Sequence, residues 1–335
     1  MKLTRRNFVK LAGMAGLVGL AGSFSACTNS GSTVVNSVAE ADSLPRPGKA
    51  KVFFSKNLDA EHLIALYNKV NSDVTGKVGI KVHTGEPNGP NILPRDWVKA
   101  LQAQIPNSAI IETNTLYSGA RSTTERHRKT LKINDWTFCD VDILDEDGDI
   151  YFPVKKGFHL EKVAMGAHLI NYDSIVVLTH FKGHSMGGFG GSMKNIAIGC
   201  ASGKMGKRQV HGLEDFNEWV MGKTLMELMA DSAKAICAHF GNHITYINVL
   251  NRISVDCDCT GAGAAAPELP DIGILASTDI LAIDKAAVDL IYNFPEDSKY
   301  SLITRIESRE GLYQLTAMEK HQLGTTNYEL IDIDK

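Results

Sequence analysis

Two histidines, two lysines and five glycines occur within the stretch THFKGHSMGGFGGSMKN, residues 179–195. Glycine allows backbone N–H groups to approach an anion closely, and a helix that begins after the glycines would add the positive end of its dipole. We interpret the stretch as a cradle for a ligand with a phosphate or carboxylate group, and its lysines as the counter-charges. The alternative interpretation is a flexible surface loop.

The glycine-rich stretch matches no standard nucleotide-binding motif. The segment that begins at Gly188 lacks the third glycine of G-x-G-x-x-G, and residues 199–205 lack the spacing and the hydroxyl residue of a P-loop. The residues of the stretch that we assign to ligand binding are Lys182, Gly188, Gly190, Gly191, Lys194 and Asn195.

A second chemically active segment is Asp256-Cys257-Asp258-Cys259. If it is extended, both thiols point to one side and both carboxylates to the other. A disulfide between residues two apart is strained, whereas two thiolates suit a soft metal ion or a redox reaction. A tetrahedral site needs four ligands, so Cys200 or a histidine of the glycine-rich stretch would have to contribute. Metal or cluster binding, redox or catalytic thiols, and simple packing all remain open for Cys200, Cys257 and Cys259.

Further polar residues follow other apolar runs of the sequence. Lys81, His83 and Glu86 follow one run, and Asn114 ends another. Lys81 and Asn114 are candidates for contact with a cofactor, although a buried ion pair is the alternative for Lys81 and Glu86. The candidates for proton transfer or ligation are His83, Glu86, His180 and His184.

These groups need a scaffold that brings distant segments of the chain together. Short β-branched apolar runs alternate with amphipathic stretches, which is the change of period typical of βα units. The pattern predicts an α/β fold with a mostly parallel sheet flanked by helices, a Rossmann-like three-layer arrangement. In such sheets ligands lie beyond the carboxyl ends of the strands. The predicted strands are 51–55, 78–83, 109–114, 174–181, 244–251 and 271–277, and the predicted helices are 59–71, 94–104, 121–131 and 280–294.

Composition limits the classes of protein to which the chain can belong. With 335 residues, 44% of them hydrophobic, it can bury one large α/β core or two smaller ones. The formal charge of -3, from 35 basic and 38 acidic residues, provides no broad basic face. We therefore expect no nucleic-acid partner.

The first residues predict export. The segment TRRNFVK, residues 4–10, resembles the twin-arginine signal, and the apolar run 11–21 is shorter than the about 20 residues of a membrane span. We expect residues 1–27 to be a signal peptide read by the twin-arginine translocase, and the protein to reach the periplasm or cell envelope. Cys27 follows a degenerate lipoprotein box, so a lipid anchor there and simple cleavage near Ala26 both remain open.

The remaining chain divides into two predicted parts. Residues 28–50 are polar, small and proline-containing, and we expect them to form a flexible linker. Residues 51–335 would form the α/β domain. Because twin-arginine export commonly serves proteins that acquire a cofactor before translocation, the signal favours a bound metal ion or organic cofactor.

Several blocks of sequence together resemble a known family. They are IKVHTGE (80–86), TNTLY (113–117), LTHFKGHSMGGFGGSMKNIAIGCASGKMGK (178–207), DCDC (256–259), PDIGILASTDILAIDKAAVDL (270–290) and ESREGL (307–312). Their order and text resemble the domain of unknown function 362 family, DUF362, over about residues 50–333.

Members of this family are often labelled as iron–sulfur proteins, but the resemblance implies no established activity. Many members of the family carry a ferredoxin-type insertion with C-x-x-C-x-x-C spacing after the block that corresponds to residues 199–202. Residues 204–219 of this chain contain no cysteine, so we expect no ferredoxin-type 4Fe-4S cluster. At the level of fold and polar loop ends, the chain is also similar to the lactate racemase type of enzyme, which binds a nickel-pincer nucleotide.

The leading hypothesis is an exported protein with one site for a metal ion or an anionic organic cofactor, used in redox or proton-transfer chemistry. A rival hypothesis is a non-enzymatic envelope lipoprotein that binds a small solute. A third is a thiol redox protein that uses Cys257 and Cys259. In each case a small-molecule ligand or cofactor is the expected partner, and a membrane is contacted only through an anchor at Cys27.

Overall fold

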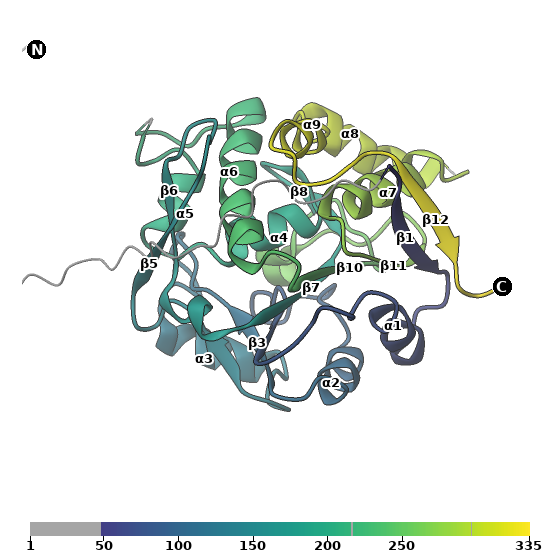
Figure 1. The fold of residues 1–335 in the computed structure, drawn as a ribbon, viewed down its shortest axis with the longest axis horizontal. Helices are drawn as coiled ribbons and strands as arrows, with labels where there is room; N and C mark the ends of the chain where they lie inside the picture. The colour runs from purple at the N-terminus through teal and green to yellow at the C-terminus, as the bar shows by residue number, and fades with distance from the viewer. Residues whose placement is uncertain (1–47, 216, 296) are drawn as a thin grey trace, which may run out of the picture. The chain divides into compact units, whose positions relative to one another are not determined.

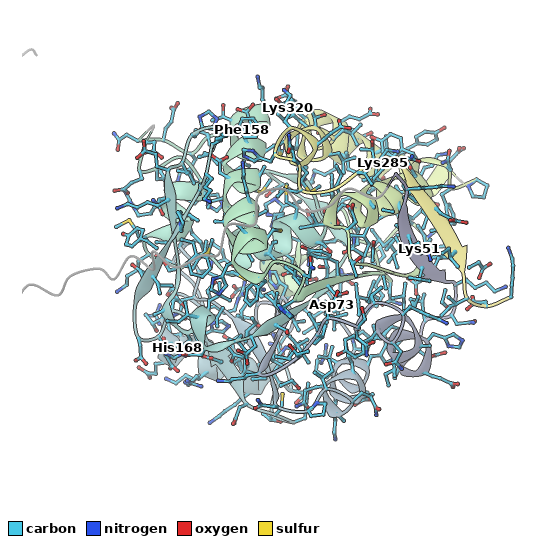
Figure 2. All side chains as sticks on the ribbon, viewed as in Figure 1. Lys51, Asp73, Phe158, His168, Lys285 and Lys320 are labelled. Atoms are coloured by element: carbon cyan, nitrogen blue, oxygen red, sulfur yellow. The ribbon has the colours of Figure 1, made fainter. Side chains whose placement is uncertain are left out.

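The computed structural model describes residues 48–215, 217–295 and 297–335 (Figure 1). The predicted signal peptide, Cys27 and nearly all of the predicted linker lie outside the described residues. No helix in the described part of the chain combines the length and the apolar character that a membrane crossing requires. The side chains of the described residues fill both sides of a large central sheet (Figure 2).

The central sheet has eight strands, and the predicted α/β class is confirmed. Seven of its strands have at least one parallel neighbour, whereas β11 is antiparallel to both of its neighbours, β1 and β10. In spatial order the strands are β12 (Tyr328–Asp332), β1 (Ala50–Ser55), β11 (Gly273–Ser277), β10 (Ile244–Leu250), β7 (Ser174–His180), β2 (Val78–Lys81), β3 (Ser108–Glu112) and β4 (Val141–Ile143).

Helices cover both faces of the sheet, because the central strands are apolar on both sides. In β7, Ile175 and Val177 belong to one hydrophobic core, and Val176 and Leu178 belong to the other. This alternation follows from the two-residue period of a strand. The first face packs against α4 (Ser192–Gly199), α6 (Gly222–Phe240), α7 (Ile280–Tyr292), α8 (Tyr300–Ser308) and α9 (Tyr313–Lys320), and the second against α1 (Ala60–Tyr67), α2 (Arg95–Ala103) and α3 (Thr124–Ile133) (Figure 1).

Side-chain caps fix where three of these helices begin. Asp59, Thr123 and Asp279 each accept a hydrogen bond from the backbone N–H three residues later. Such caps satisfy N–H groups that have no partner within the helix, and each is worth about 1 kcal/mol. The caps explain why the helices begin close to the predicted positions.

Several small elements surround the central sheet. β5 (Asp149–Pro153) pairs with β6 (Lys162–Gly166), and the short helix α5 (Gly206–Val210) packs on β6. The glycine-rich stretch, predicted as a loop, forms the hairpin β8 (Lys182–His184) and β9 (Gly188–Gly190). The hairpin and α4 bring this stretch over the carboxyl ends of the parallel strands.

Candidate functional site

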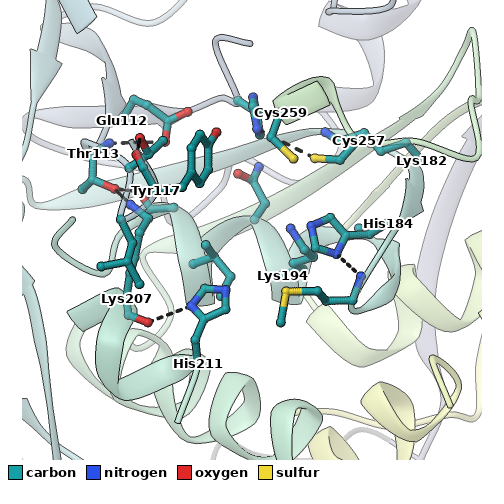
Figure 3. A pocket seen from close by; sticks show the side chains of 18 of the residues that line it. Glu112, Thr113, Tyr117, Lys182, His184, Lys194, Lys207, His211, Cys257 and Cys259 are labelled. Atoms are coloured by element: carbon teal, nitrogen blue, oxygen red, sulfur yellow. Dashed lines mark hydrogen bonds between the residues drawn. The ribbon is translucent and has the colours of Figure 1, made fainter. Parts of the chain in front are cut away.

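A cavity of about 290 Å³ lies where the carboxyl ends of β2, β3 and β7 face the β8–β9 hairpin and α4 (Figure 3). One face of α4 borders it, where Ile198 lies three and four residues after Asn195 and Lys194. The cavity therefore occupies the place where parallel α/β sheets bind their ligands.

The cavity gathers ten of the fifteen predicted site residues, although these come from three separate segments of the chain, 81–83, 182–195 and 257–259. The predicted residues that line it are Lys81, His83, Lys182, His184, Gly190, Gly191, Lys194, Asn195, Cys257 and Cys259. The predicted residues that lie outside its lining are Glu86, Asn114, His180, Gly188 and Cys200.

The two thiols of the DCDC segment border the cavity, although the backbone conformation of the segment differs from the extended one considered in the sequence analysis. The segment is not extended: Cys257 precedes the 3-10 helix η2 (Asp258–Gly263). The buried Asp258 carboxylate between the thiols is bound by His180 Nδ1 at 2.9 Å and by Lys182 Nζ at 2.8 Å. These contacts anchor the turn, so that both sulfur atoms border the cavity.

Cys257 is surrounded by groups that stabilise a thiolate. The Cys259 thiol donates a hydrogen bond to it, and this bond, followed by the Lys194 ammonium and His83, brings the pKa of Cys257 well below its ordinary value (Figure 3). His83 Nε2 lies 3.9 Å from the Cys257 sulfur. The same hydrogen bond, together with burial, raises the pKa of Cys259. The surroundings therefore favour the thiolate form of Cys257 and the thiol form of Cys259, and both residues border the cavity.

The cavity histidines His83 and His184 are held in one tautomer. His83 Nδ1 accepts the backbone N–H of Gly85 at 3.0 Å, and His184 Nδ1 accepts those of Met186 at 3.2 Å and Gly187 at 2.9 Å. Because a backbone N–H can only donate, both Nδ1 atoms must be unprotonated. Burial lowers the pKa of both imidazoles. Each ring is therefore neutral and carries its proton on Nε2.

The three lysines predicted to hold an anion differ in their availability. Lys81 is committed to an ion pair, with Nζ 3.0 Å from Glu112 Oε1, and it also donates to Asn195 Oδ1 at 3.0 Å. Lys182 is paired with Asp258. The Lys194 ammonium makes no hydrogen bond or ion pair with any described residue. Among the three, Lys194 is the cation that a ligand can reach without displacing a carboxylate.

The N-terminus of α4 already holds an anion of the protein itself. The Asp284 carboxylate accepts the backbone N–H of Ser192 at 2.7 Å and that of Met193 at 3.0 Å. A Cβ at Gly191 would lie 2.4 Å from Asp284 Oδ1, so this glycine is needed for the approach of the carboxylate. The expected contribution of this helix dipole to ligand binding is therefore wrong, because Asp284 takes that position.

The predicted site residues outside the lining have structural partners. Glu86 accepts from Arg121 Nε and from the Tyr117 hydroxyl, both at 2.8 Å. Asn114 Nδ2 donates to the Thr124 hydroxyl at 3.1 Å. These contacts favour the structural alternative, a buried ion pair, for Glu86.

His180, Gly188 and Cys200 are likewise placed within the packing around the cavity. His180 uses its second nitrogen, Nε2, for a 2.8 Å hydrogen bond with the carbonyl of Asn251. A Cβ at Gly188, where φ is +78°, would lie 2.8 Å from the Cα of Gly311. Cys200 is fully buried, and burial raises the pKa of its thiol to about 12.

Several lining residues were not predicted. Lys207 is buried, and its ammonium donates to the Thr113 hydroxyl and to the carbonyls of Asn114 and Ala201. Burial lowers the pKa of Lys207 to about 8. The signal for Lys207 was its place at the end of the block 178–207, and Tyr117 likewise ends the block 113–117. The other unpredicted lining residues with polar or aromatic side chains include Tyr117, Arg121, His211 and Trp219.

The fold and the cavity define an α/β protein with a small-molecule site at the carboxyl edge of its sheet. The chain belongs to the DUF362 family, described as a domain of unknown function, whose model matches residues 78–289. No curated protein sequence matches the chain.

Two solved structures resemble the chain at low identity. Lactate racemase apoprotein from Thermoanaerobacterium thermosaccharolyticum is 11% identical over 74% of this chain, with a TM-score of 0.39. A protein from Thermotoga maritima is 13% identical over 70% of this chain, with a TM-score of 0.45. The matches span 58% and 59% of those chains, so this chain covers less than two thirds of either. At these TM-scores the likeness indicates neither a ligand nor a reaction.

The cysteines of the described residues do not fit an iron–sulfur cluster of four thiolates. Cys257 and Cys259 border the cavity, whereas Cys200 and Cys237 belong to one hydrophobic core and Cys139 packs against the other. A 4Fe-4S cluster requires four thiolates at one place. The cavity offers two, which suits thiolate chemistry or a mononuclear soft metal ion.

Proposed function

We propose that the cavity binds a small anionic organic molecule, a cofactor or a substrate, and presents Cys257 to it as a reactive thiolate. The observation that carries the proposal is the position of the Cys257 sulfur beside the Cys259 thiol, His83 and the Lys194 ammonium. Lys194 has no carboxylate partner among the described residues, so it can attract an anion as well as stabilise the thiolate.

The proposed site combines nucleophilic and proton-transfer groups. A thiolate at Cys257 can attack an electrophilic atom of a bound ligand, and Cys259 supplies a neighbouring proton. The neutral Nε2–H group of His184 can donate a hydrogen bond to a ligand oxygen, while that of His83 lies beside the Cys257 sulfur. A disulfide between residues two apart is strained. Attack of Cys257 on a ligand is therefore favoured over a lasting disulfide between Cys257 and Cys259.

Alkylation measured against pH tests the thiolate. Iodoacetamide should modify Cys257 of the wild-type protein at a pH well below the ordinary thiol pKa of about 8.5. Lys194→Met should move the reaction to higher pH, because it removes a stabilising ammonium. Cys139, whose pKa is raised by burial, is the internal control. If Cys257 and Cys139 reacted with the same pH dependence, the proposal would be wrong.

Protection from alkylation tests the anionic ligand. Inorganic phosphate and pyruvate, compared with sodium chloride at equal ionic strength, should slow the modification of Cys257 in the wild-type protein. The same anions should protect Cys257 less in Lys194→Met, which keeps the cavity but lacks the ammonium. Equal rates with and without the two anions would argue against an anion site here.

A second candidate function is the binding of a soft metal ion. Donor atoms of His184, Cys257 and Cys259 lie within 4.8 Å of one another, and thiolate and imidazole ligands suit zinc, copper or nickel. However, ligating histidines usually donate their second ring N–H, whereas Nδ1 of His184 accepts two backbone N–H groups. A metal ion would require this ring to exchange partners.

A titration with cobalt(II) separates the two candidates. Stoichiometric thiolate-to-metal absorption that disappears in both Cys257→Ser and Cys259→Ser would support the metal site. The Cys139→Ser variant is the matched control and should bind as the wild-type protein does. Weak absorption without a fixed stoichiometry would leave thiolate chemistry as the better account.

We also propose that the folded domain is exported. The support is the twin-arginine pattern around Arg5 and Arg6 and the small residues before Cys27. Replacement of both arginines by lysine should leave the protein in the cytoplasmic fraction, and intact-mass measurement should show whether Cys27 carries a lipid. Unchanged localisation of the double variant would contradict the proposal.

A further inference from the structure

His211 differs from the other histidines of the cavity in the hydrogen bond that fixes its ring. Its Nδ1 lies 2.7 Å from the carbonyl oxygen of Lys207, one turn earlier along α5. A carbonyl can only accept, so Nδ1 must carry the proton and Nε2 must carry the free lone pair. The opposite holds for His83 and His184, whose Nδ1 atoms accept backbone N–H groups.

The free nitrogen of His211 is available to a ligand. The ring borders the cavity (Figure 3). It meets the Trp219 ring edge-on, with 5.0 Å between ring centroids. Nε2 has no hydrogen-bond partner among the described residues, and it is not one of the fully enclosed side-chain atoms that lack a partner. An uncommitted lone pair therefore faces a cavity that is otherwise rich in hydrogen-bond donors.

We propose that His211 is the proton acceptor of this cavity, and that its Nε2 takes a proton from the bound ligand while His184 donates a hydrogen bond to it. This inference rests on the proposed function, because it requires the ligand to occupy the same cavity. It names the ligand class more closely: an anion that also carries an acidic O–H, N–H or activated C–H group.

The charges around His211 favour its neutral ring. Burial, together with the Lys194 and Lys207 ammonium groups, lowers the pKa of His211 to about 4, although the hydrogen bond to Lys207 acts in the opposite direction. The ring is therefore neutral at pH 7, with its lone pair available. A bound anion would stabilise the imidazolium. When the proton moves to Nε2, the ligand keeps the electron pair of the broken bond, and the Lys194 ammonium offsets its new negative charge.

Reaction with diethyl pyrocarbonate tests directly which imidazole nitrogens have an available lone pair. The reagent transfers an ethoxycarbonyl group to an unprotonated ring nitrogen, and peptide mass mapping locates it. His211 should react at least about tenfold faster than His184, the factor expected when a backbone hydrogen bond must first be lost. His243 is the matched control, because its Nδ1 also donates to a carbonyl, that of Asp73, but the residue is exposed to solvent away from the cavity.

Inorganic phosphate distinguishes the inference from the proposed function. Phosphate should protect His211 and leave His243 unaffected if the anion binds in the cavity. If His211 reacts fast and phosphate does not slow the reaction, Nε2 carries a free lone pair as inferred, but the cavity does not bind the anion. Slow reaction of His211, at the rate of His184, would overturn the inference even if Cys257 were still protected by phosphate.

Nitrogen NMR provides an independent readout in the full-length protein. Histidine-labelled protein should show the proton of His211 on Nδ1 and the protons of His83 and His184 on Nε2. The signal assignment comes from His211→Asn, whose side-chain amide can keep the donation to the Lys207 carbonyl and so preserve the turn. A proton on Nε2 of His211 would refute the inference regardless of reagent access.

Discussion

Replacement of Glu112 by Gln should destabilise the protein strongly, because Lys81 would lose the one carboxylate within contact distance of it among residues 48–215, 217–295 and 297–335. The side chains are 1% and 4% exposed, and Nζ lies 3.0 Å from Oε1. Without this charge, the Lys81 ammonium is left with neutral acceptors alone: the carbonyl of Val82, Asn195 Oδ1 and the amide oxygen of the substituted side chain. Breaking a buried ion pair from one side costs about 3–5 kcal/mol of the free energy of unfolding.

Replacement of Lys81 should lower the free energy of unfolding less than replacement of Glu112 does. In Lys81→Met, Glu112 keeps the Arg121 guanidinium at 3.6 Å and two backbone N–H donors at 3.2 Å, so we expect a loss of about 1.5–3 kcal/mol. The double variant should lose less than the sum of the single losses, with a coupling of about 2 kcal/mol, within the range for contacting pairs.

Urea denaturation of the four proteins, followed by circular dichroism, measures these free energies. The double-mutant cycle is the decisive part, since the two single losses alone also contain packing changes. Additive losses in the double variant would refute the reasoning, and would return Lys81 to the set of cations available to a ligand. A loss below about 1 kcal/mol for Glu112→Gln would do the same.

Three further outcomes follow from the contacts described above. Gly183→Ala should cost about 1–3 kcal/mol of unfolding free energy, because its Cβ would lie 2.2 Å from a carbonyl oxygen, whereas Gly190→Ala meets only ordinary contacts of 3.6 Å and should fold normally. Burial raises the pKa of Asp284 from 3.8 to about 6, so its contribution to stability is complete below about pH 4 and is lost as the pH rises through 6. The difference in unfolding free energy between wild-type protein and Asp284→Asn should therefore change by up to about 3 kcal/mol between pH 4 and 7, and a constant difference would contradict this. Asp258→Asn should allow iodoacetamide to react with Cys257 at lower pH, because it removes a neighbouring negative charge; a shift to higher pH would contradict the electrostatic argument.

Hydrophobic periodicity was sufficient to predict the fold class. Each of the six predicted strands corresponds to a strand of the sheet, and α2 and α7 lie within two residues of their predicted limits. The direction of β11 could not be predicted, because a buried apolar strand can have the same sequence pattern in a parallel and in an antiparallel sheet. The β8–β9 hairpin was missed for a different reason: its glycines and its lysine have low strand propensity, and its position is set by contact with the chain around Val255.

The place of the site was predictable, but the roles of its residues were less so. Strand ends located the cavity because parallel strands bring their carboxyl ends to one edge. Which cations stay available depends on partners distant in sequence, such as Asp258 for Lys182 and Glu112 for Lys81. The property that distinguishes His211, its hydrogen bond to the Lys207 carbonyl, depends on backbone geometry that residue types do not encode.

The pairing of β1 with β12 has a consequence for biosynthesis. β1 is the first strand of the described chain, and its outer neighbour β12 follows all the other described elements. While the polypeptide is still on the ribosome, the outer edge of β1 has no partner until residues 328–332 emerge. Unpaired strand edges can form backbone hydrogen bonds with other chains. A product of premature termination upstream of Tyr328 would therefore leave β1 open and be prone to aggregate.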